Sequence, residues 1–350
     1  KEAYEQVDPK LLDVIRKALV NIRDYHAKQK QYSWFDSDES GIILGQKVTP
    51  LKTVGVYVPG GKAVYPSSVL MNVIPAKVAG VSNIIMTTPC GKDGKVYPST
   101  LVAAKEAGVD AIYKVGGAQA IAALAFGTES IPKVDKIVGP GNIYVALAKK
   151  AVFGYVSIDS IAGPSEIMVL ADETANPRFV AADLLSQAEH DEMASAILVT
   201  TSETLAEQVS VEVDKFVEVL SRKEIIRKSL DNYGYILVAD TMQDAIDTVN
   251  EIASEHLELV TKNPFETMTK IRNAGAIFIG EYFAGPNHVL PTNGTAKFFS
   301  PLSVDDFIKK SSIISYSREA LEPVYKDIVQ FAECEKLTAH ANSIRVRFED

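Results

Sequence analysis

Cysteine is scarce in this chain, and the scarcity excludes two kinds of site. The two cysteines, Cys90 and Cys334, lie far apart and in no C-x-x-C spacing. Neither a disulfide framework nor a zinc site made of thiolates is expected from such a pattern. So few thiols are typical of a protein from a reducing compartment, and we therefore expect a cytoplasmic location.

Basic residues are in deficit. The chain has 36 Lys and Arg against 45 Asp and Glu, which gives a formal net charge of -9. A nucleic-acid partner would require a basic face, and an anionic membrane surface would require a polybasic segment. The sequence also has no apolar run of membrane-spanning length and no visible signal peptide at its start. We therefore expect neither nucleic acid nor membrane as a partner.

What is present is an ordinary globular composition with an alternating pattern. Hydrophobic residues make up 47% and charged residues 23% of 350 residues, enough for about two domains. Short β-rich runs alternate with helical stretches, which predicts βαβ units on mostly parallel sheets. We expect strands at residues 53–58, 83–87, 111–115, 136–138, 166–170, 196–200, 234–238, 257–260 and 276–279. We expect helices at residues 67–79, 98–107, 118–125, 177–189, 203–220, 242–253 and 264–273.

The alternation occurs twice, which predicts an α/β fold with two Rossmann-like halves. Asp8 and Pro9 are a typical helix start, and the apolar spacing after them predicts a long amphipathic helix toward Gln31. We expect four segments: an N-terminal helix and lead-in, a first α/β half, a second α/β half and a small C-terminal segment. Their boundaries are 1–54, 55–162, 163–300 and 301–350.

Glycine-rich turns gather at the ends of the expected strands. In an open parallel sheet, ligands bind outside the carboxyl ends of the strands, where glycine lets the backbone approach them closely. Each turn alone is more simply a tight βα connection, but four together favour a nucleotide site. No G-x-G-x-x-G fingerprint is present, so the sequence does not indicate the standard dinucleotide-binding motif of Rossmann folds. The turns are Pro59-Gly60-Gly61, Gly116-Gly117, Gly139-Pro140-Gly141 and Gly163-Pro164.

The five histidines are few enough to weigh singly. His26 lies in the first helix, and we expect a solvated surface residue without a role. His190 follows Gln187 by one helical turn, so the two side chains face the same way and could bind a metal. The alternative for His190 is a helix-terminal residue stabilised by the helix dipole.

His256 adjoins Glu255 where a helix is expected to pass into a strand. An acid beside an imidazole suits proton transfer and water activation, although a histidine at a helix end is also common. His288 lies in a stiff loop with two prolines, and His340 lies near the chain end, five residues after Glu335. Since no thiolates are available, a zinc site would use histidine and oxygen ligands, with one position open to substrate.

Several stretches, in order over nearly the whole chain, together resemble the histidinol dehydrogenase family. They are Tyr57-Val58-Pro59-Gly60-Gly61, Tyr65-Pro66-Ser67-Ser68-Val69-Leu70-Met71, Gly116-Gly117-Ala118-Gln119-Ala120-Ile121, Val138-Gly139-Pro140-Gly141-Asn142 and Ala162-Gly163-Pro164-Ser165-Glu166, followed by the segments around Gln187, His190, Glu255, His256, Gly285 to Thr292, Phe299 to Val304 and His340.

The resemblance implies a reaction with its cofactors, a fold and a quaternary structure. The family oxidises L-histidinol to L-histidine in two NAD-linked steps through an aldehyde held in the site. Its zinc, one per subunit, binds the substrate. Its architecture is aldehyde-dehydrogenase-like, and its homodimers are intertwined, so that the C-terminal segment completes the partner's site. The half 55–162 would bind NAD, and the half 163–300 would carry the zinc and acid/base residues.

The resemblance also implies roles for individual residues. The matching zinc ligands are Gln187, His190 and His340, which would also contact substrate. The matching acid/base pair is Glu255 and His256, and His256 would contact substrate too. Ser165, His288 and Glu335 match substrate contacts, and Tyr57, Gln119 and Asn142 match NAD contacts.

The sequence departs from the family pattern at one ligand. The family carries an extra stretch ending in Gly-Asp-Tyr before Phe283-Ala284-Gly285-Pro286, and its Asp is the remaining zinc ligand. Here the chain runs Ile279-Gly280-Glu281-Tyr282-Phe283. Either Glu281 replaces the aspartate or a loop is missing from this chain, and we favour the missing loop. The family also has a longer N-terminus.

Two other functions compete with a dehydrogenase. Histidine and carboxylate groups around zinc could activate water in a zinc-dependent hydrolase. A sensor could bind zinc or NAD without turnover. NADH formation separates the dehydrogenase from both.

Overall fold

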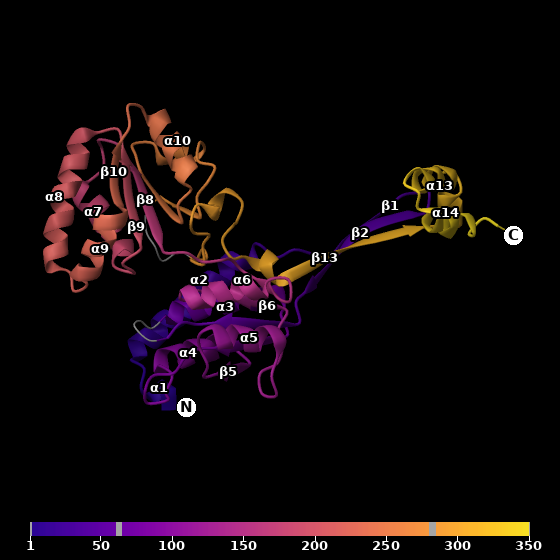
Figure 1. Ribbon diagram of the computed structural model, residues 1–350, viewed down its shortest axis with the longest axis horizontal. Helices are drawn as coiled ribbons and strands as arrows, with labels where there is room; N and C mark the ends of the chain where they lie inside the picture. The colour runs from indigo at the N-terminus through magenta and orange to yellow at the C-terminus, as the bar shows by residue number, and fades with distance from the viewer. Residues whose placement is uncertain (1, 61–64, 280–284, 350) are drawn as a thin grey trace. The chain divides into compact units, whose positions relative to one another are not determined.

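The structure is a computed structural model that describes residues 2–60, 65–279 and 285–349 (Figure 1). The chain forms two compact units. Unit 1 consists of Lys1–Lys30 and Leu51–Phe307, and unit 2 consists of Gln31–Pro50 and Ile308–Asp350.

The first half of unit 1 is a 5-stranded parallel sheet in the order β5-β4-β3-β6-β7. Successive residues of a strand face opposite sides, so Ile84 and Ile85 enter two different buried clusters. The cluster on one face includes α2, α3 and α4, and the cluster on the other includes α5 and α6. The strands are β3 (Thr53–Tyr57), β4 (Asn83–Thr87), β5 (Ala111–Tyr113), β6 (Lys136–Val138) and β7 (Ser157–Ile158); the helices are α1 (Glu2–Glu5), α2 (Pro9–Ala27), α3 (Pro66–Ala79), α4 (Pro98–Ala107), α5 (Ala118–Phe126) and α6 (Ile143–Val152).

The second half repeats this plan with the strand order β10-β9-β8-β11-β12, again all parallel. Ile167 and Val169 pack toward α7, α8 and α9, whereas Met168 and Leu170 pack toward α10 on the opposite face (Figure 1). The strands are β8 (Glu166–Ala171), β9 (Ser195–Thr200), β10 (Gly234–Val238), β11 (His256–Val260) and β12 (Ala276–Phe278); the helices are α7 (Pro177–Ala188), α8 (Glu203–Val219), α9 (Lys223–Tyr233), α10 (Met242–Ile252) and α11 (Pro264–Met268).

Both sheets place their strands in the sequential order third, second, first, fourth, fifth, with helices on both faces. This is the doubly wound arrangement of a Rossmann-like half. The predicted α/β fold class, with two such halves, is confirmed.

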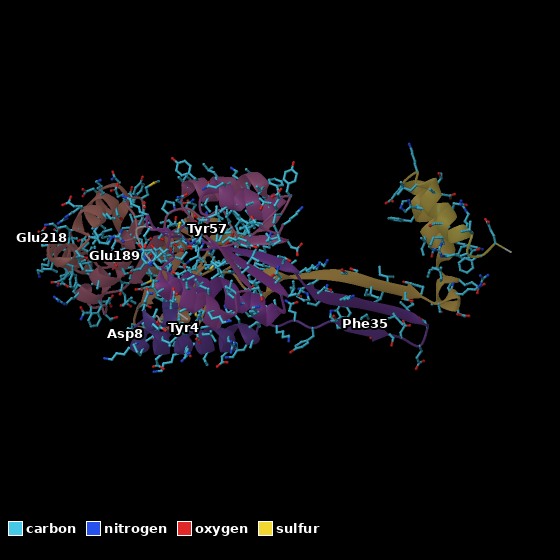
Figure 2. The ribbon with its side chains drawn as sticks, turned by 90° about the horizontal axis from the view of Figure 1, so that it is seen from below. Tyr4, Asp8, Phe35, Tyr57, Glu189 and Glu218 are labelled. Carbon is cyan, nitrogen blue, oxygen red and sulfur yellow. The ribbon has the colours of Figure 1, made fainter. Side chains whose placement is uncertain are left out.

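Unit 2 is built on an antiparallel sheet in the order β1-β2-β13. The strands form a long ribbon with the helices of the unit at one end (Figure 1). Phe35 on β1 is 61% exposed (Figure 2). The buried cluster of this unit contains Val329, Ala332 and Ala341. The elements are β1 (Trp34–Ser37), β2 (Ile42–Pro50), β13 (Ile308–Tyr316), α12 (Arg318–Leu321), α13 (Tyr325–Cys334) and α14 (Thr338–Arg345).

The strands of unit 2 were not expected from the sequence. Their side chains are largely half-buried or exposed, so no apolar alternation marks them. Unit 2 thus joins residues from the predicted N-terminal and C-terminal segments, and the four-segment division by role stays a prediction. The helices α6 and α9 were also not expected, and α2 ends at Ala27 rather than near Gln31. The described residues also include the short 3₁₀ helices η1 (Thr295–Lys297) and η2 (Val304–Phe307).

The expectation for His26 is wrong, because its side chain is 0% exposed. The ring Nδ1 lies 2.7 Å from Gln29 Oε1, and the ring Nε2 lies 3.4 Å from Asn287 Nδ2. A tertiary contact from a segment more than 250 residues later therefore covers this histidine.

Of the helices in the described ranges, none has the length and apolarity needed to cross a membrane.

Candidate active site

Glu255 and His256 lie together at the amino edge of the second sheet. The helix α10 ends at Ile252, and Ala253 takes a left-handed conformation (φ 56°) that turns the chain into β11, which begins at His256. The two side chains are buried, with residue exposures of 7% and 8%. The sequence therefore located the junction correctly, and the fold places His256 on the first position of a strand that pairs with β8, directly after Glu255.

The ring of His256 is held in one orientation. Its Nδ1 lies 3.0 Å from the carbonyl oxygen of Glu166, and the ring stacks on Phe278 with centroids 5.7 Å apart. A carbonyl oxygen can only accept, so Nδ1 carries the proton and Nε2 carries the free lone pair. This is the tautomer that a general base needs.

The carboxylate of Glu255 is held from the same neighbour. Glu255 Oε2 accepts a hydrogen bond from the backbone N–H of Glu166 at 3.0 Å, and it lies 3.5 Å from His256 Nδ1. These contacts use Oε2 alone. The arrangement can hold one carboxylate oxygen still while the group exchanges a proton through the other.

Glu166 returns the contact. Its Oε2 accepts from the backbone N–H of Glu255 at 3.2 Å, and its Oε1 accepts from the backbone N–H of Asn293 at 3.1 Å. Burial raises the pKa of the Glu166 carboxyl, and the nearby Glu255 adds to the rise against the effect of the two N–H donors. The expected substrate contact Ser165 directly precedes it and accepts from Ser195 N–H through its carbonyl at 3.0 Å.

A cavity of about 370 Å³ opens beside His256. Its walls come from α2, α3, β12 and the segment 285–290, and they include both His256 and His288. Burial, with the neighbouring His256, lowers the pKa of His288 to about 4, so His288 is neutral at neutral pH. The described lining residues are Ala18, Asn21, Ile22, Ser67, Leu70, Met71, His256, Ala276, Ile277, Phe278, Ile279, Gly285, Pro286, Asn287, His288 and Leu290.

The segment that carries His288 is fastened to the first half. Gly285 has φ 108°, and a Cβ there would lie 2.6 Å from the carbonyl oxygen of Asn21, so glycine is required. Asn287 is 4% exposed and donates to the carbonyl oxygen of Met71 at 2.7 Å. The stiff loop expected from the sequence is thus held at a defined place against α2 and α3.

The three expected NAD contacts lie at the carboxyl edge of the first sheet. Tyr57 ends β3, and its hydroxyl accepts from the backbone N–H of Gly117 at 3.1 Å. Gln119 is exposed at the start of α5. Asn142 caps α6, with its side-chain oxygen accepting from Tyr144 N–H at 3.1 Å. The three residues therefore lie where the chain leaves β3, β5 and β6, each beside one of the glycine turns of the first half.

The glycine turns do not all lie at carboxyl edges. The turns at Gly60, Gly117 and Gly139 follow strands of the first sheet, whereas Gly163 precedes β8 in the second. The candidate residues thus lie at the carboxyl edge of the first sheet and at the amino edge of the second. The rule that ligands bind outside the carboxyl ends of parallel strands therefore describes the first half only.

The expected metal ligands are distributed over both units. Gln187 is half-buried near the end of α7, and His190 is exposed just after it. His340 on α14 and Glu335 after α13 are exposed in unit 2. In the described parts of a single chain, no group of three or more His, Cys, Asp and Glu side chains is placed to hold a metal. Glu281, the alternative ligand, lies outside the described residues.

Sequence reasoning missed the contacts of Glu166 with Glu255 and His256. The residue was visible beside Ser165, but its contacts join strands that are about 90 positions apart in the chain. A second missed feature is the carboxyl pair of Asp183 on α7 and Glu258 on β11, in which burial first, and then the Asp183 carboxyl, raises the pKa of Glu258 to about 8. No local pattern indicates either pairing.

The fold defines a class of protein, an α/β protein of aldehyde-dehydrogenase-like architecture, in which Glu255 and His256 lie together and His256 lines a cavity. A solved structure of a putative aldehyde dehydrogenase from Anabaena variabilis has a similar fold, with a TM-score of 0.53 at 12% identity over 87% of this chain and 84% of that one. At this identity the likeness concerns the fold alone.

Much nearer relatives identify the family. The crystal structure of histidinol dehydrogenase from Elizabethkingia anophelis matches with a TM-score of 0.94 at 41% identity, over 99% of this chain and 82% of that one. Histidinol dehydrogenases of Halalkalibacterium halodurans and Bacillus subtilis are 60% and 61% identical over 99% of this chain, and 84% and 83% of their own lengths are covered. The family model for histidinol dehydrogenase matches residues 1–348. The chain belongs to the histidinol dehydrogenase family of oxidoreductases.

Proposed function

We propose that this chain oxidises L-histidinol to L-histidine, the last step of histidine biosynthesis, with NAD accepting a hydride in each of two steps. Family membership supports the substrate. The observation that carries the chemistry is the hydrogen bond from His256 Nδ1 to the Glu166 carbonyl, which leaves Nε2 as a base beside a cavity.

In the first step His256 acts as the base. Its Nε2 takes the hydroxyl proton of histidinol while the hydride leaves the carbinol carbon, so an alcohol becomes an aldehyde. Neutral His288 on the cavity wall can donate or accept a hydrogen bond to the substrate, and we assign Ser165 a substrate contact as well.

In the second step Glu255 acts on water. Its carboxylate takes a proton from the water that adds to the aldehyde, and the resulting hydrate loses the second hydride to give the acid. A thiohemiacetal route would need a cysteine in the site. Both Cys90 and Cys334 are exposed, and neither is among the described residues that line the cavity.

We assign NAD to the half 55–162, with contacts from Tyr57, Gln119 and Asn142. NAD supplies the hydride acceptor. The support is the place of these residues at the carboxyl edge of a doubly wound sheet, where such sheets bind nucleotides.

We assign one zinc ion per subunit to Gln187 and His190 of the half 163–300, together with the partner subunit's His340. The nitrogen and oxygen donors suit zinc, which supplies Lewis acidity to a bound alcohol. The alignment with the Halalkalibacterium halodurans relative runs over 356 residues, more than the 350 residues of this chain. The alignment therefore contains positions that this chain lacks, and we assign the remaining ligand to a missing stretch before Phe283 rather than to Glu281.

We further propose a homodimer in which the segment 301–350, with Glu335 and His340, completes the partner's site. Unit 2 buries a small cluster of its own and leaves several large apolar side chains exposed, so a second chain would stabilise it. These side chains include Trp34, Phe35, Ile314 and Phe331.

We also propose a cytoplasmic location, which two exposed free thiols fit.

The experiment is a product balance. Zinc-loaded protein is mixed with L-histidinol and NAD, and NADH absorbance is followed against histidine formed. We expect about two NADH for each histidine, because each hydride transfer reduces one NAD. No NADH from folded, dimeric, zinc-loaded protein would contradict the proposal and favour a zinc-dependent hydrolase or a sensor.

A further inference from the structure

The backbone of Glu166 contacts both proposed acid/base residues, Glu255 through its N–H group and His256 through its carbonyl oxygen. Its backbone N–H donates to Glu255 Oε2 at 3.0 Å, and its carbonyl oxygen accepts from His256 Nδ1 at 3.0 Å. The position of the Glu166 backbone therefore sets the orientation of the Glu255 carboxylate and the tautomer of His256.

The side chain of Glu166 fixes that backbone in place. One carboxylate accepts from two backbone N–H groups, those of Glu255 and Asn293. The first contact makes the exchange with Glu255 reciprocal across β8 and β11. The second ties β8 to the segment that follows His288, and this segment is also bonded through Gly163 N–H to Thr292 Oγ1 at 2.7 Å.

We propose that Glu166 is a positioning residue for the proposed reaction. Its carboxylate accepts two backbone hydrogen bonds and thereby holds Glu255, His256 and the segment 285–293, which carries His288, in fixed relative positions. This inference rests on the proposed function. Glu166 moves no proton to substrate in this scheme, because its two oxygens are engaged by backbone donors. It acts through Glu255 and His256.

The first variant is Glu166→Gln. An amide has one acceptor oxygen and one NH₂ group, so either Glu255 N–H or Asn293 N–H would face another donor. The backbone carbonyl of residue 166 is then free to move from His256 Nδ1. Small displacements of reacting groups can cost about 100-fold in rate. We expect kcat to fall by about that factor with a much smaller change in KM.

The matched control is Asp172→Asn at the opposite end of the same strand. Asp172 follows β8, is 8% exposed, and accepts from Lys262 N–H at 2.7 Å, just beyond the end of β11. It makes the same kind of carboxylate contact between the same two strands, but far from Glu255 along the strand. We expect D172N to lower Tm while kcat stays close to that of the unaltered enzyme.

The readout beyond activity is the ring of His256. Nitrogen NMR of histidine-labelled protein distinguishes the two neutral tautomers, and the signal of His256 is assigned by its loss in His256→Asn. We expect one tautomer in the unaltered protein and in D172N, and a mixture in E166Q. The pH profile of kcat/KM should shift in E166Q and not in D172N.

The outcomes separate clearly. If E166Q and D172N lower kcat equally with an unchanged His256 signal, or if E166Q leaves kcat unaltered, Glu166 is merely structural and the inference is overturned. If E166Q does not fold, Glu166→Asp takes its place; it keeps the charge, is too short for both N–H groups, and should show the same signature in weaker form. If unaltered protein makes no NADH, the proposed function fails, while the ring signal still tests the positioning.

Discussion

Lys149 and Asp159 form a buried ion pair beneath the turn that follows β6, with side-chain exposures of 2% and 4%. Lys149 Nζ also donates to the carbonyl oxygen of Gly139 at 3.0 Å, and Asp159 Oδ2 accepts from Gly139 N–H at 2.7 Å. The ion pair therefore holds both the N–H and the carbonyl group of Gly139, in the turn that leads to Asn142. Since Asn142 is a proposed NAD contact, the pair should matter for cofactor binding.

We predict that Lys149→Met costs about 3–5 kcal/mol of stability, because it leaves Asp159 buried without its cation. NAD affinity measured by titration calorimetry should fall about tenfold, equivalent to 1.4 kcal/mol. The control is Lys136→Met on β6, the strand that leads into this turn, which removes an ion pair to Asp306 (2.8 Å) and leaves the contacts of Gly139 in place. Equal loss of NAD affinity in both variants would contradict the prediction.

The double variant Lys149→Met/Asp159→Leu refines this test. Replacing a buried ion pair by apolar residues is often neutral for stability, so Tm should recover in part. The Gly139 N–H and carbonyl groups would still lack their partners, so NAD affinity should stay low. Recovery of NAD affinity together with Tm would show that the pair acts on stability alone.

Glu258 makes stability depend on pH. Its folded pKa is raised to about 8 by burial and by Asp183, whereas an unfolded glutamate titrates near 4.5. Between these values the folded chain holds a proton that the unfolded chain has released, so this group's stabilising contribution is lost as pH rises toward 8.

We predict that Glu258→Gln raises Tm at pH 8 and leaves it nearly unaltered at pH 5. An amide is uncharged at both values and can donate to the Asp183 carboxylate. The gain should be roughly 2–4 °C for each kcal/mol. Thermal melts at both pH values measure it, with exposed Glu251→Gln on α10 as the control. A gain of the same size at pH 5 would count against this account.

The two proposed steps can be separated by substitution. His256→Asn removes the base for histidinol and should slow NADH formation from histidinol by about 10²–10⁴-fold. Oxidation of supplied histidinal should be less affected, because Glu255 serves that step. Glu255→Gln should show the converse, with the aldehyde trapped by an added amine reagent. Equal loss of both half-reactions in both variants would refute the division of roles.

Subunit complementation tests whether His340 acts in the partner's site. His190→Ala and His340→Ala should each lose bound zinc and activity. If the ligands come from different chains, co-expressed variants form mixed dimers with one intact site, and about a quarter of the activity returns. If both ligands come from one chain, each chain of a mixed dimer lacks one ligand, and no activity should return. Zinc content of the purified mixed dimer gives a second measurement.

Some features of this protein were predictable because they depend on neighbours in the sequence. The continuous apolar run Ile167-Met168-Val169-Leu170 is typical of a strand buried on both faces, and short β-rich runs alternate with helices in both halves. Glu255 and His256 are adjacent in the chain, so their pairing needed no tertiary information. The α/β class and the junction at residue 255 followed from these local patterns.

Other features could not be read locally. The strands β2 and β13 pair residues 42–50 with residues 308–316, and their exposed side chains carry no apolar period. His26 reads as a surface residue until Asn287 is brought to it.

The sequence by itself determined that the chain has two halves of alternating strands and helices, because strand and helix periods are set by residues a few positions apart. Only the tertiary structure decided that the Glu166 backbone faces His256 and that Lys149 lies under Gly139. Hydrogen bonds of this kind depend on which strands become neighbours, and that choice is made by burial of the whole apolar surface rather than by any local segment.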